Sequence, residues 1–207
     1  MRIVCISDTH GQHAAIRLPE GDLLIHAGDF TPDGQLADTA RFMQWLDGQP
    51  FPHKVLISGN HDFLAEREPG LFRSLLPAGC IYLENEGAEI AGLRIWGSPI
   101  TPWFHDWAFN RQPGPDIRRY WQAIPEGLDL LITHGPPYGI RDLNLEGSLA
   151  GCRDLNHELW RARPRAHVFG HIHEAYGITQ VEEIRFINAS QLDHRYQLAN
   201  PPIVIDL

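Results

Sequence analysis

Three features are scarce in this 207-residue sequence, and each scarcity excludes a class of protein. Cysteine occurs three times (Cys5, Cys80 and Cys152), far apart and outside any C-x-x-C pair, which excludes a disulfide framework. No run approaches the roughly 18–20 consecutive apolar residues that a membrane span requires. The 17 Lys and Arg residues are outnumbered by 26 Asp and Glu, and the net charge of −9 argues against nonspecific binding to nucleic acid or to an anionic membrane.

Internal boundaries and a leading targeting signal are also missing. The composition does not shift along the chain, and no Ser- or Gly-rich linker divides it. At about 150 residues per domain, residues 1–207 are expected to form a single domain. Since a strand-like run begins at Ile3 with no cleavage site after it, we expect a cytoplasmic protein.

What the sequence does contain is a short apolar run that stops at Gly, Asp, Asn or His, repeated five times. Runs rich in Val and Ile and bounded by turn residues predict strands buried on both faces. These runs cover residues 3–7, 23–25, 55–57, 130–132 and 168–169. Because ligands bind beyond the carboxyl ends of strands in open α/β sheets, the five endings predict one shared site.

Helical and further strand patterns lie between these runs. Apolar residues at helical spacing predict three helices, over residues 36–48, 115–123 and 152–163. Gly48 is the expected C-terminal stop of the first helix. Strands that carry no catalytic ending are expected at residues 93–96, 184–187 and 203–205. The predicted fold class is therefore α/β, with mixed rather than purely parallel sheets.

Seven side chains that follow the strand ends can ligate a metal ion: Asp8, His10, Asp29, Asn60, His134, His171 and His173. Residues two apart in an extended segment point to the same side, so Asp8 and His10 could meet one ion. Asp29 could bridge two ions with its two oxygens. A single polar residue after a strand has an ordinary structural explanation, such as a hydrogen-bonded histidine. We infer a metal site because all five strands end in this way, in order along the chain.

The series of motifs resembles that of the calcineurin-like metallophosphoesterase superfamily. Its members in this sequence are Asp8-x-His10, Gly28-Asp29, Gly59-Asn60-His61-Asp62, His134-Gly135 and Gly170-His171-x-His173. Longer strings are similar to the brain-type metallophosphoesterase-domain proteins, a branch counted among class III cyclic nucleotide phosphodiesterases. These strings cover residues 26–31, 133–137, 169–174, 188–190 and 200–207.

The resemblance implies a fold and a set of ligands. The fold is a four-layer α/β/β/α sandwich with mixed sheets and a dinuclear site at one sheet edge. One divalent ion would be held by Asp8, His10, Asp29 and His173. The other would be held by Asp29, Asn60, His134 and His171. Carboxylate, amide and imidazole ligands without thiolate suit Mn²⁺, which we expect, with Fe²⁺ or Zn²⁺ as alternatives.

The expected reaction follows from charge. Two divalent ions with Asp8, Asp29 and a bridging hydroxide would leave the centre about +1, which makes it a phosphate receptor inside an acidic chain. The metal-bridging hydroxide is the expected nucleophile for an in-line displacement at phosphorus. By the resemblance His61 stands beside the substrate, where it would act as the general acid, with Asp62 holding its imidazole cationic. The structural alternative is that His61 is an ordinary surface histidine.

The absence of one arginine limits the class of phosphate ester that we expect as the substrate. Residues 30–34 follow Asp29 without the arginine that clamps a phosphate dianion in the phosphoprotein-phosphatase branch of the family. A monoester would lose that bidentate contact, so we expect a phosphodiesterase. The resemblance alone suggests a small cyclic nucleotide, such as a 2′,3′-cyclic nucleotide. A phosphomonoesterase, a nuclease with the same ions, and a nucleotide-binding protein without turnover remain as alternatives.

The remaining features concern binding. Trp103, Phe104 and His105 are expected to bind substrate by stacking on a nucleobase, with a packed flap or an oligomer contact as the alternative. A homodimer is left open. The arginines of residues 161–165 are expected to complement a helix end rather than bind a polynucleotide, and a turn-forming role is expected for Asn188 and Ser190.

Overall fold

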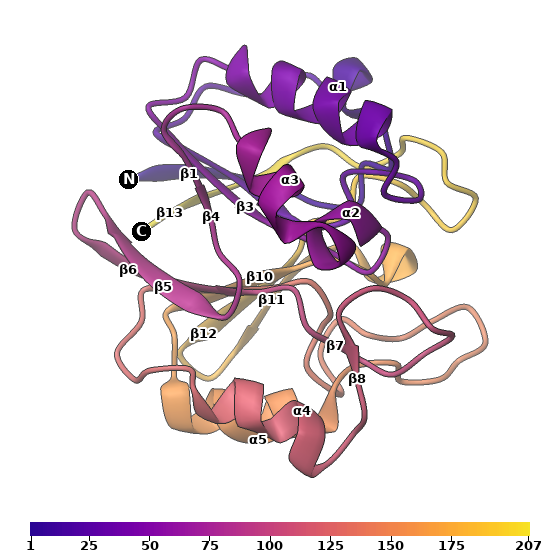
Figure 1. The fold of residues 1–207 in the computed structure, drawn as a ribbon. Coiled ribbons are helices and arrows are strands. Elements are labelled where there is room, and N and C mark those ends of the chain that lie inside the picture. Colours follow the sequence, from indigo (N-terminus) through magenta and orange to yellow (C-terminus); the bar gives the residue numbers. More distant parts are fainter.

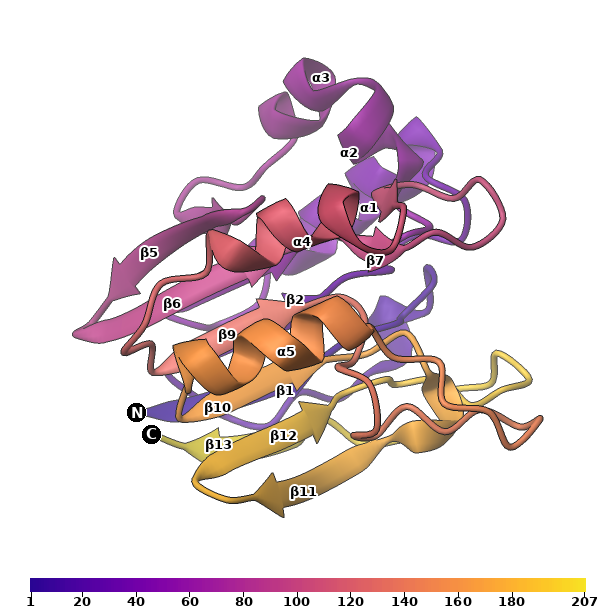
Figure 2. The ribbon, with the colours of Figure 1, turned by 90° about the horizontal axis from the view of Figure 1, so that it is seen from below.

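Two mixed β-sheets stack face to face, and helices cover the outer face of each (Figures 1 and 2). This arrangement is seen in the computed structural model, which describes all 207 residues. The predicted four-layer α/β/β/α sandwich is confirmed. The Val- and Ile-rich runs form central strands that are buried on both faces, as their composition predicts.

The first sheet has five strands: β1 (Arg2–Ile6), β2 (Leu23–Ala27), β3 (His53–Ile57), β4 (Cys80–Tyr82) and β13 (Ile203–Asp206). Their spatial order is β13-β1-β2-β3-β4. Strands β1 to β4 run parallel to one another, and β13 is antiparallel to β1. The carboxyl ends of β1, β2 and β3 therefore lie at one edge.

The second sheet has six strands: β5 (Glu86–Ile90), β6 (Leu93–Ser98), β9 (Leu130–Thr133), β10 (Ala166–Phe169), β11 (Gly177–Val181) and β12 (Ile184–Asn188). Their order is β11-β12-β10-β9-β6-β5, with only the outer strands β5 and β11 antiparallel to their neighbours. Two short parallel strands, β7 (Thr101–Pro102) and β8 (Asn110–Arg111), join the two ends of the loop formed by residues 103–109.

The helices divide between the two outer layers (Figure 1). The first sheet is covered by α1 (Leu36–Asp47), α2 (Phe63–Arg67) and α3 (Pro69–Ser74). The second is covered by α4 (Pro115–Gln122) and α5 (Arg153–Ala162). Short 3₁₀ turns occur at η1 (His13–Ala15) and η2 (His173–Ala175). None of the helices has the length and apolar character needed to cross a membrane.

Alternation along β1 shows how the layers are joined. Ile3 and Cys5 belong to the hydrophobic cluster between the two sheets. Val4 and Ile6 belong to the cluster that lies under the helices. Since successive side chains on a strand point to opposite faces, one short apolar run fills both clusters.

The predicted helices and strands are present, with ends that shift by a few residues. Gly48 does follow α1, but its φ of −70° is not the left-handed conformation that a terminal glycine often adopts. The sequence analysis missed α2 and α3, which are only five and six residues long. It also missed β5 and β11, which lie at the edges of the second sheet and are largely solvent-accessible.

The two sheets pack so closely at Gly97 that no side chain fits there. A Cβ at this position of β6 would lie 2.5 Å from the Leu83 Cβ and 2.8 Å from the Ile57 Cγ2, both on the side of the first sheet. We expect Gly97→Ala to lower the free energy of unfolding by about 1–3 kcal/mol through overpacking, measured by urea denaturation. The control is Gly70→Ala in α3, where a Cβ meets nothing within 4 Å, so its stability should stay level or rise. Equal effects of the two changes would contradict the packing described here.

Candidate metal centre

The polar ends of the parallel strands meet at one edge of the sandwich. Backbone hydrogen bonds continue beyond the strands, with the Asp8 N–H donating to the Gly28 carbonyl (3.0 Å) and the Gly170 N–H donating to the His134 carbonyl (2.9 Å). The His171 N–H donates to the Asp8 carboxylate (3.0 Å), which links the second sheet to the first. Loops from both sheets are therefore fixed to one another at this edge.

Four of the seven predicted ligands have a left-handed backbone. The φ angles are 52° at Asp8, 39° at His10, 56° at Asp29 and 69° at His171. Residues other than glycine adopt this conformation at an energetic cost, and such residues cluster at functional sites. The expectation that an extended segment aligns Asp8 with His10 is wrong, because β1 ends at Ile6 and a turn brings the two side chains together.

Glycines in the motifs allow close approach between the loops. A Cβ at Gly170 would overlap the Asp8 carboxylate. A Cβ at Gly28, where φ is +97°, would lie 2.6 Å from the His134 Nδ1. These positions therefore have no room for a side chain.

The predicted ligands gather into two groups of three, in each of which the ligand atoms lie within 4.8 Å of one another. The first group is Asp8, His10 and His173, and the second is Asp29, His134 and His171. The Asn60 Oδ1 lies 2.8 Å from the His134 Nε2, which adds an amide oxygen to the second group. All seven predicted side chains are thus at one place.

Asp29 belongs to the second group and also lies close to the first. Its Oδ1 accepts a hydrogen bond from the His61 N–H (2.8 Å). Its Oδ2 lies 3.7 Å from the His10 Nε2 and 3.3 Å from the His134 Nε2. The sequence analysis expects the two oxygens of Asp29 to bridge two ions, and in the structure Oδ2 lies near a histidine of each group.

Backbone carbonyls orient two of the histidines. The His134 Nδ1 lies 2.9 Å from the Ala27 carbonyl oxygen, and the His173 Nδ1 lies 3.0 Å from the Asp193 carbonyl oxygen. A proton on Nδ1 donates to the carbonyl in each case, which leaves Nε2 facing the centre. This is the common arrangement of metal-ligating histidines.

Ser190 is a site residue that sequence reasoning missed. Its hydroxyl donates to the Asp8 Oδ2 (2.7 Å) and is fully buried. Asn188 accepts from the Ser190 N–H (3.1 Å) and donates to the Ile172 carbonyl (2.8 Å), between the two ligands of the His-x-His motif. The expected turn-forming role is only part of the function of this segment. No local sequence signal connects Ser190 with Asp8, which is 182 residues away.

Asp62 does not contact the His61 imidazole, which corrects its expected role. The Asp62 carboxylate accepts from the backbone N–H groups of Asp29 (2.9 Å), Gly59 (2.8 Å) and Thr31 (3.0 Å), and from the Thr31 hydroxyl. It therefore braces the loops after β2 and β3. The His61 Nδ1 lies 2.6 Å from the Pro32 carbonyl oxygen instead.

Two further buried histidines brace the ligand loops. The His26 Nε2 lies 3.0 Å from the Thr9 hydroxyl, between the ligands Asp8 and His10. The His167 Nε2 lies 2.7 Å from the Thr133 hydroxyl, next to His134. Both imidazoles are completely buried, so each sheet contributes one histidine–threonine pair below the site.

A cavity of about 470 Å³ opens above the two groups. The loops 103–109, 141–150 and 191–199 project on this side of the molecule (Figure 1). Trp103, Phe104 and Trp107 form an apolar part of the wall. The His61 ring lies 4.8 Å from the Trp107 ring, so the aromatic loop reaches the ligand edge.

His105 is not part of the cavity wall, although the sequence analysis expected it to bind substrate. It is exposed and packs its ring against Phe104, at a centroid distance of 4.1 Å. Trp107, two residues later, lines the cavity. Tyr196, which the sequence analysis missed, also lines it and lies 5.0 Å from the His10 ring and 5.1 Å from the His173 ring.

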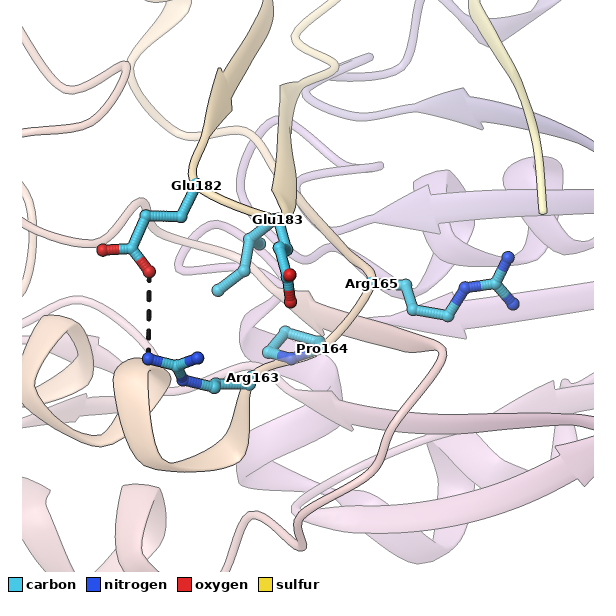
Figure 3. A pocket seen from close by; sticks show the side chains of 6 residues that line it. Arg163, Pro164, Arg165, Glu182 and Glu183 are labelled. Atoms are coloured by element: carbon cyan, nitrogen blue, oxygen red, sulfur yellow. Dashed lines mark ion pairs between the residues drawn. The ribbon is translucent and has the colours of Figure 1, made fainter.

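A second, smaller pocket lies at the other end of the strands (Figure 3). Its volume is about 70 Å³, and its lining includes Arg163, Arg165 and Glu182. Arg163 forms an ion pair with Glu182 (3.8 Å) and donates to the Trp160 carbonyl of α5 (3.2 Å). Arg165 pairs with Asp129 (2.9 Å). Both arginines therefore have intramolecular partners, but of the two only Arg163 contacts the end of the preceding helix as expected.

Comparison with known proteins shows the family to which the chain belongs. Residues 1–175 match the model of the calcineurin-like phosphoesterase family. The chain belongs to this family. It is 41% identical over its full length to metallophosphoesterase domain-containing protein 1 of Homo sapiens and of Mus musculus, covering 71% of each. The predicted resemblance is thereby confirmed.

A solved structure shares the fold of this calcineurin-like phosphoesterase at low sequence identity. Phosphopantetheinyl hydrolase from Mycobacterium tuberculosis aligns with a TM-score of 0.64 at 16% identity, over 94% of this chain and 90% of that one. The likeness extends to the arrangement of layers and sheets.

In the absence of metal, the negative charges of the two buried carboxylates are balanced by protonation of two histidines. Burial acts to lower the pKa of His134, but the charge of Asp29 and the contact with its carboxylate raise that pKa to about 9. Burial likewise opposes protonation of His173, whereas the hydrogen bond to Asp8 and its charge raise the pKa to about 9. Burial lowers the pKa of His10 to about 4 and that of His171 to about 3. Without metal, two protons therefore occupy the groups that contain two carboxylates.

The stability of the metal-free protein should consequently fall as the pH rises from about 6.5 to 9. His134 and His173 have a pKa of about 9 in the fold and about 6.5 when unfolded, so their stabilisation is complete below pH 6.5 and lost as pH passes 9. We expect a fall in Tm of about 5–10 °C in thermal unfolding of chelated protein. Excess divalent cation should abolish this fall, because metal-bound histidines are already neutral. A Tm that is constant or rising over this range would contradict the assignment.

Proposed function

We propose that this calcineurin-like phosphoesterase is a metal-dependent phosphodiesterase that hydrolyses a small diester, such as a 2′,3′-cyclic nucleotide. One observation carries the proposal. The seven predicted ligand side chains gather in two adjoining groups, with the Asp29 Oδ2 close to a histidine of each, beside a cavity that no Lys or Arg lines. These side chains suit bound cations that receive a phosphate. The cavity lining adds no cationic side chain that could bind a second anionic group.

The side chains fit two divalent cations. Both ring nitrogens of His10 are buried without a hydrogen-bond partner, and Asp29, Asn60 and His134 direct donor atoms to one point. We assign Asp8, His10, Asp29 and His173 to one ion, and Asp29, Asn60, His134 and His171 to the other. The ligand chemistry suits Mn²⁺, with Fe²⁺ or Zn²⁺ as alternatives. When bound, the ions supply Lewis-acid activation of water and neutralise charge at phosphorus.

His61 is positioned to donate a proton to the leaving oxygen. The Pro32 carbonyl accepts from its Nδ1, which leaves Nε2 for the cavity that the side chain lines. The carbonyl orients the His61 ring, whereas the sequence analysis expected Asp62 to hold that ring cationic. The ring lies 4.7 Å from that of His10, next to the first group of ligands. A proton delivered from this position converts a poor alkoxide leaving group into an alcohol.

The cavity walls support a diester with one flat apolar substituent. Trp103, Phe104 and Trp107 offer rings for a nucleobase, and stacking on such rings contributes roughly 1–3 kcal/mol per base. No arginine is present to hold a second phosphate charge by a bidentate contact. The walls therefore favour a monoanionic ester over a dianionic one.

A substrate and metal panel tests this function. Chelated protein resupplied with Mn²⁺, Fe²⁺ or Zn²⁺ should hydrolyse 2′,3′-cyclic nucleotides with a higher kcat/KM than nitrophenyl phosphate or single-stranded DNA. Asp29→Asn should reduce metal content and lower turnover at least 100-fold, because the shared carboxylate faces both groups. A higher kcat/KM for the monoester or for DNA would overturn the diester assignment, and full activity after chelation would overturn the metal centre.

His61→Ala tests the general acid separately from the ligands. We expect kcat to fall by about 10²–10⁴-fold with metal content unchanged, and the loss to be smaller for a nitrophenol leaving group, which needs less protonation. Metal analysis and steady-state kinetics provide the two readouts. His105→Ala is the matched control, since that histidine lies outside the cavity, and it should retain activity. Loss of metal from the His61→Ala protein would instead make His61 a ligand.

A further inference from the structure

The cavity wall contains a carboxylate that neither the ligand groups nor the general acid uses. Of the residues that line the cavity, only Asp29 and Glu174 are acidic and none is Lys or Arg. Asp29 is buried at the floor and faces the histidines of both groups. Glu174 is exposed and stands on the wall. A substrate that enters this cavity therefore meets one uncompensated negative charge above the centre.

The fold fixes Glu174 in this place. It lies in η2, directly after the predicted ligand His173, so its backbone moves with the centre. Its Oε1 accepts a hydrogen bond from the Leu145 N–H (2.8 Å) in the loop 141–150, which also contributes Asn144 and Ser148 to the wall. The hydrogen bond to the loop 141–150 therefore restricts the position of the Glu174 carboxylate in the cavity wall.

Tyr196 connects the centre with the wall that carries Glu174. It lines the same cavity as Glu174, and its ring lies 5.0 Å from that of His10 and 5.1 Å from that of His173. A phosphate placed beside Tyr196 would therefore share the cavity with the Glu174 carboxylate.

We propose that Glu174 sets an upper limit on the negative charge of the substrate. This inference rests on the proposed function and extends it from a diester to a charge class. The centre attracts one phosphate, and repulsion by Glu174 then raises the free energy of any second anionic group in the cavity. A neutral or cationic substituent meets no such repulsion, because the aromatic rings and the carboxylate of the wall tolerate or attract positive charge. Terminal monoesters, pyrophosphates and polynucleotides are disfavoured, whereas isolated diesters and zwitterionic diesters are accepted.

A series of three substrates with the same leaving group tests the limit. Nitrophenyl phosphorylcholine, bis-nitrophenyl phosphate and nitrophenyl phosphate carry net charges of 0, −1 and −2 at pH 8. For each, the ratio of kcat/KM in Glu174→Gln to that in wild type is measured, so intrinsic reactivity cancels. Glutamine keeps an oxygen to accept from Leu145, and only the charge is removed. We expect the ratio to rise by about fivefold per unit of negative charge, and the gradient to shrink at high salt.

Glu146→Gln is the matched control. Glu146 is an exposed carboxylate on the same loop as Leu145 but does not line the cavity, so its ratios should be equal across the series. Ratios for Glu174→Gln that change uniformly, or not at all, would overturn the charge limit while leaving the phosphodiesterase in place. Failure of the wild type to hydrolyse any of the three with any metal would overturn both proposals.

Discussion

The Asp29 carboxylate is the interaction on which the site depends. Its side chain is only 3% exposed, and a buried carboxylate is unfavourable unless charges and hydrogen bonds compensate it. One oxygen is held by the His61 N–H, and the other faces His10 and His134. Because Asp29 belongs to the second group and its Oδ2 also lies near His10 of the first, one side chain connects the two groups. The geometry of the centre is therefore that of one unit, although its ligands come from two sheets.

Holding that unit in place requires local backbone strain. Asp8, His10 and Asp29 all have positive φ, and neighbouring glycines leave no space for a Cβ. Such conformations persist only where the surrounding structure over-determines them. Here the bracing consists of the Asp62 carboxylate below one loop and of the buried pairs His26–Thr9 and His167–Thr133. Contacts anchored in the sheets thus offset the energetic cost of the strained turns that carry the candidate ligands.

The central strands and the candidate ligands that follow them could be predicted from the sequence for a physical reason, whereas the four-layer arrangement was implied by the family resemblance. Strands buried on both faces need continuous apolar runs, and the residue after each run lies at a known edge, so position and chemistry are both visible locally. Partners that meet only in the fold were not visible. Ser190 contacts Asp8 from 182 residues away, and Asp62 points toward Thr31 rather than its neighbour His61. Edge strands such as β11 were missed because solvent covers part of their side chains and no apolar run forms.

The aromatic loop, residues 103–109, shows a second feature that the sequence could not predict, namely which of its side chains face the cavity. Composition alone identified a segment that reaches the cavity, but it could not decide which ring faces inward. The backbone of His105 is left-handed, with a φ of 54°, and this turn places its ring outside the cavity while Trp107 approaches His61. Since a cavity wall is defined by side-chain direction, and direction within an irregular loop depends on each φ in turn, sequence patterns that rely on regular periodicity fail there. The candidate ligands avoided this failure because each lies within four residues of the end of a buried strand.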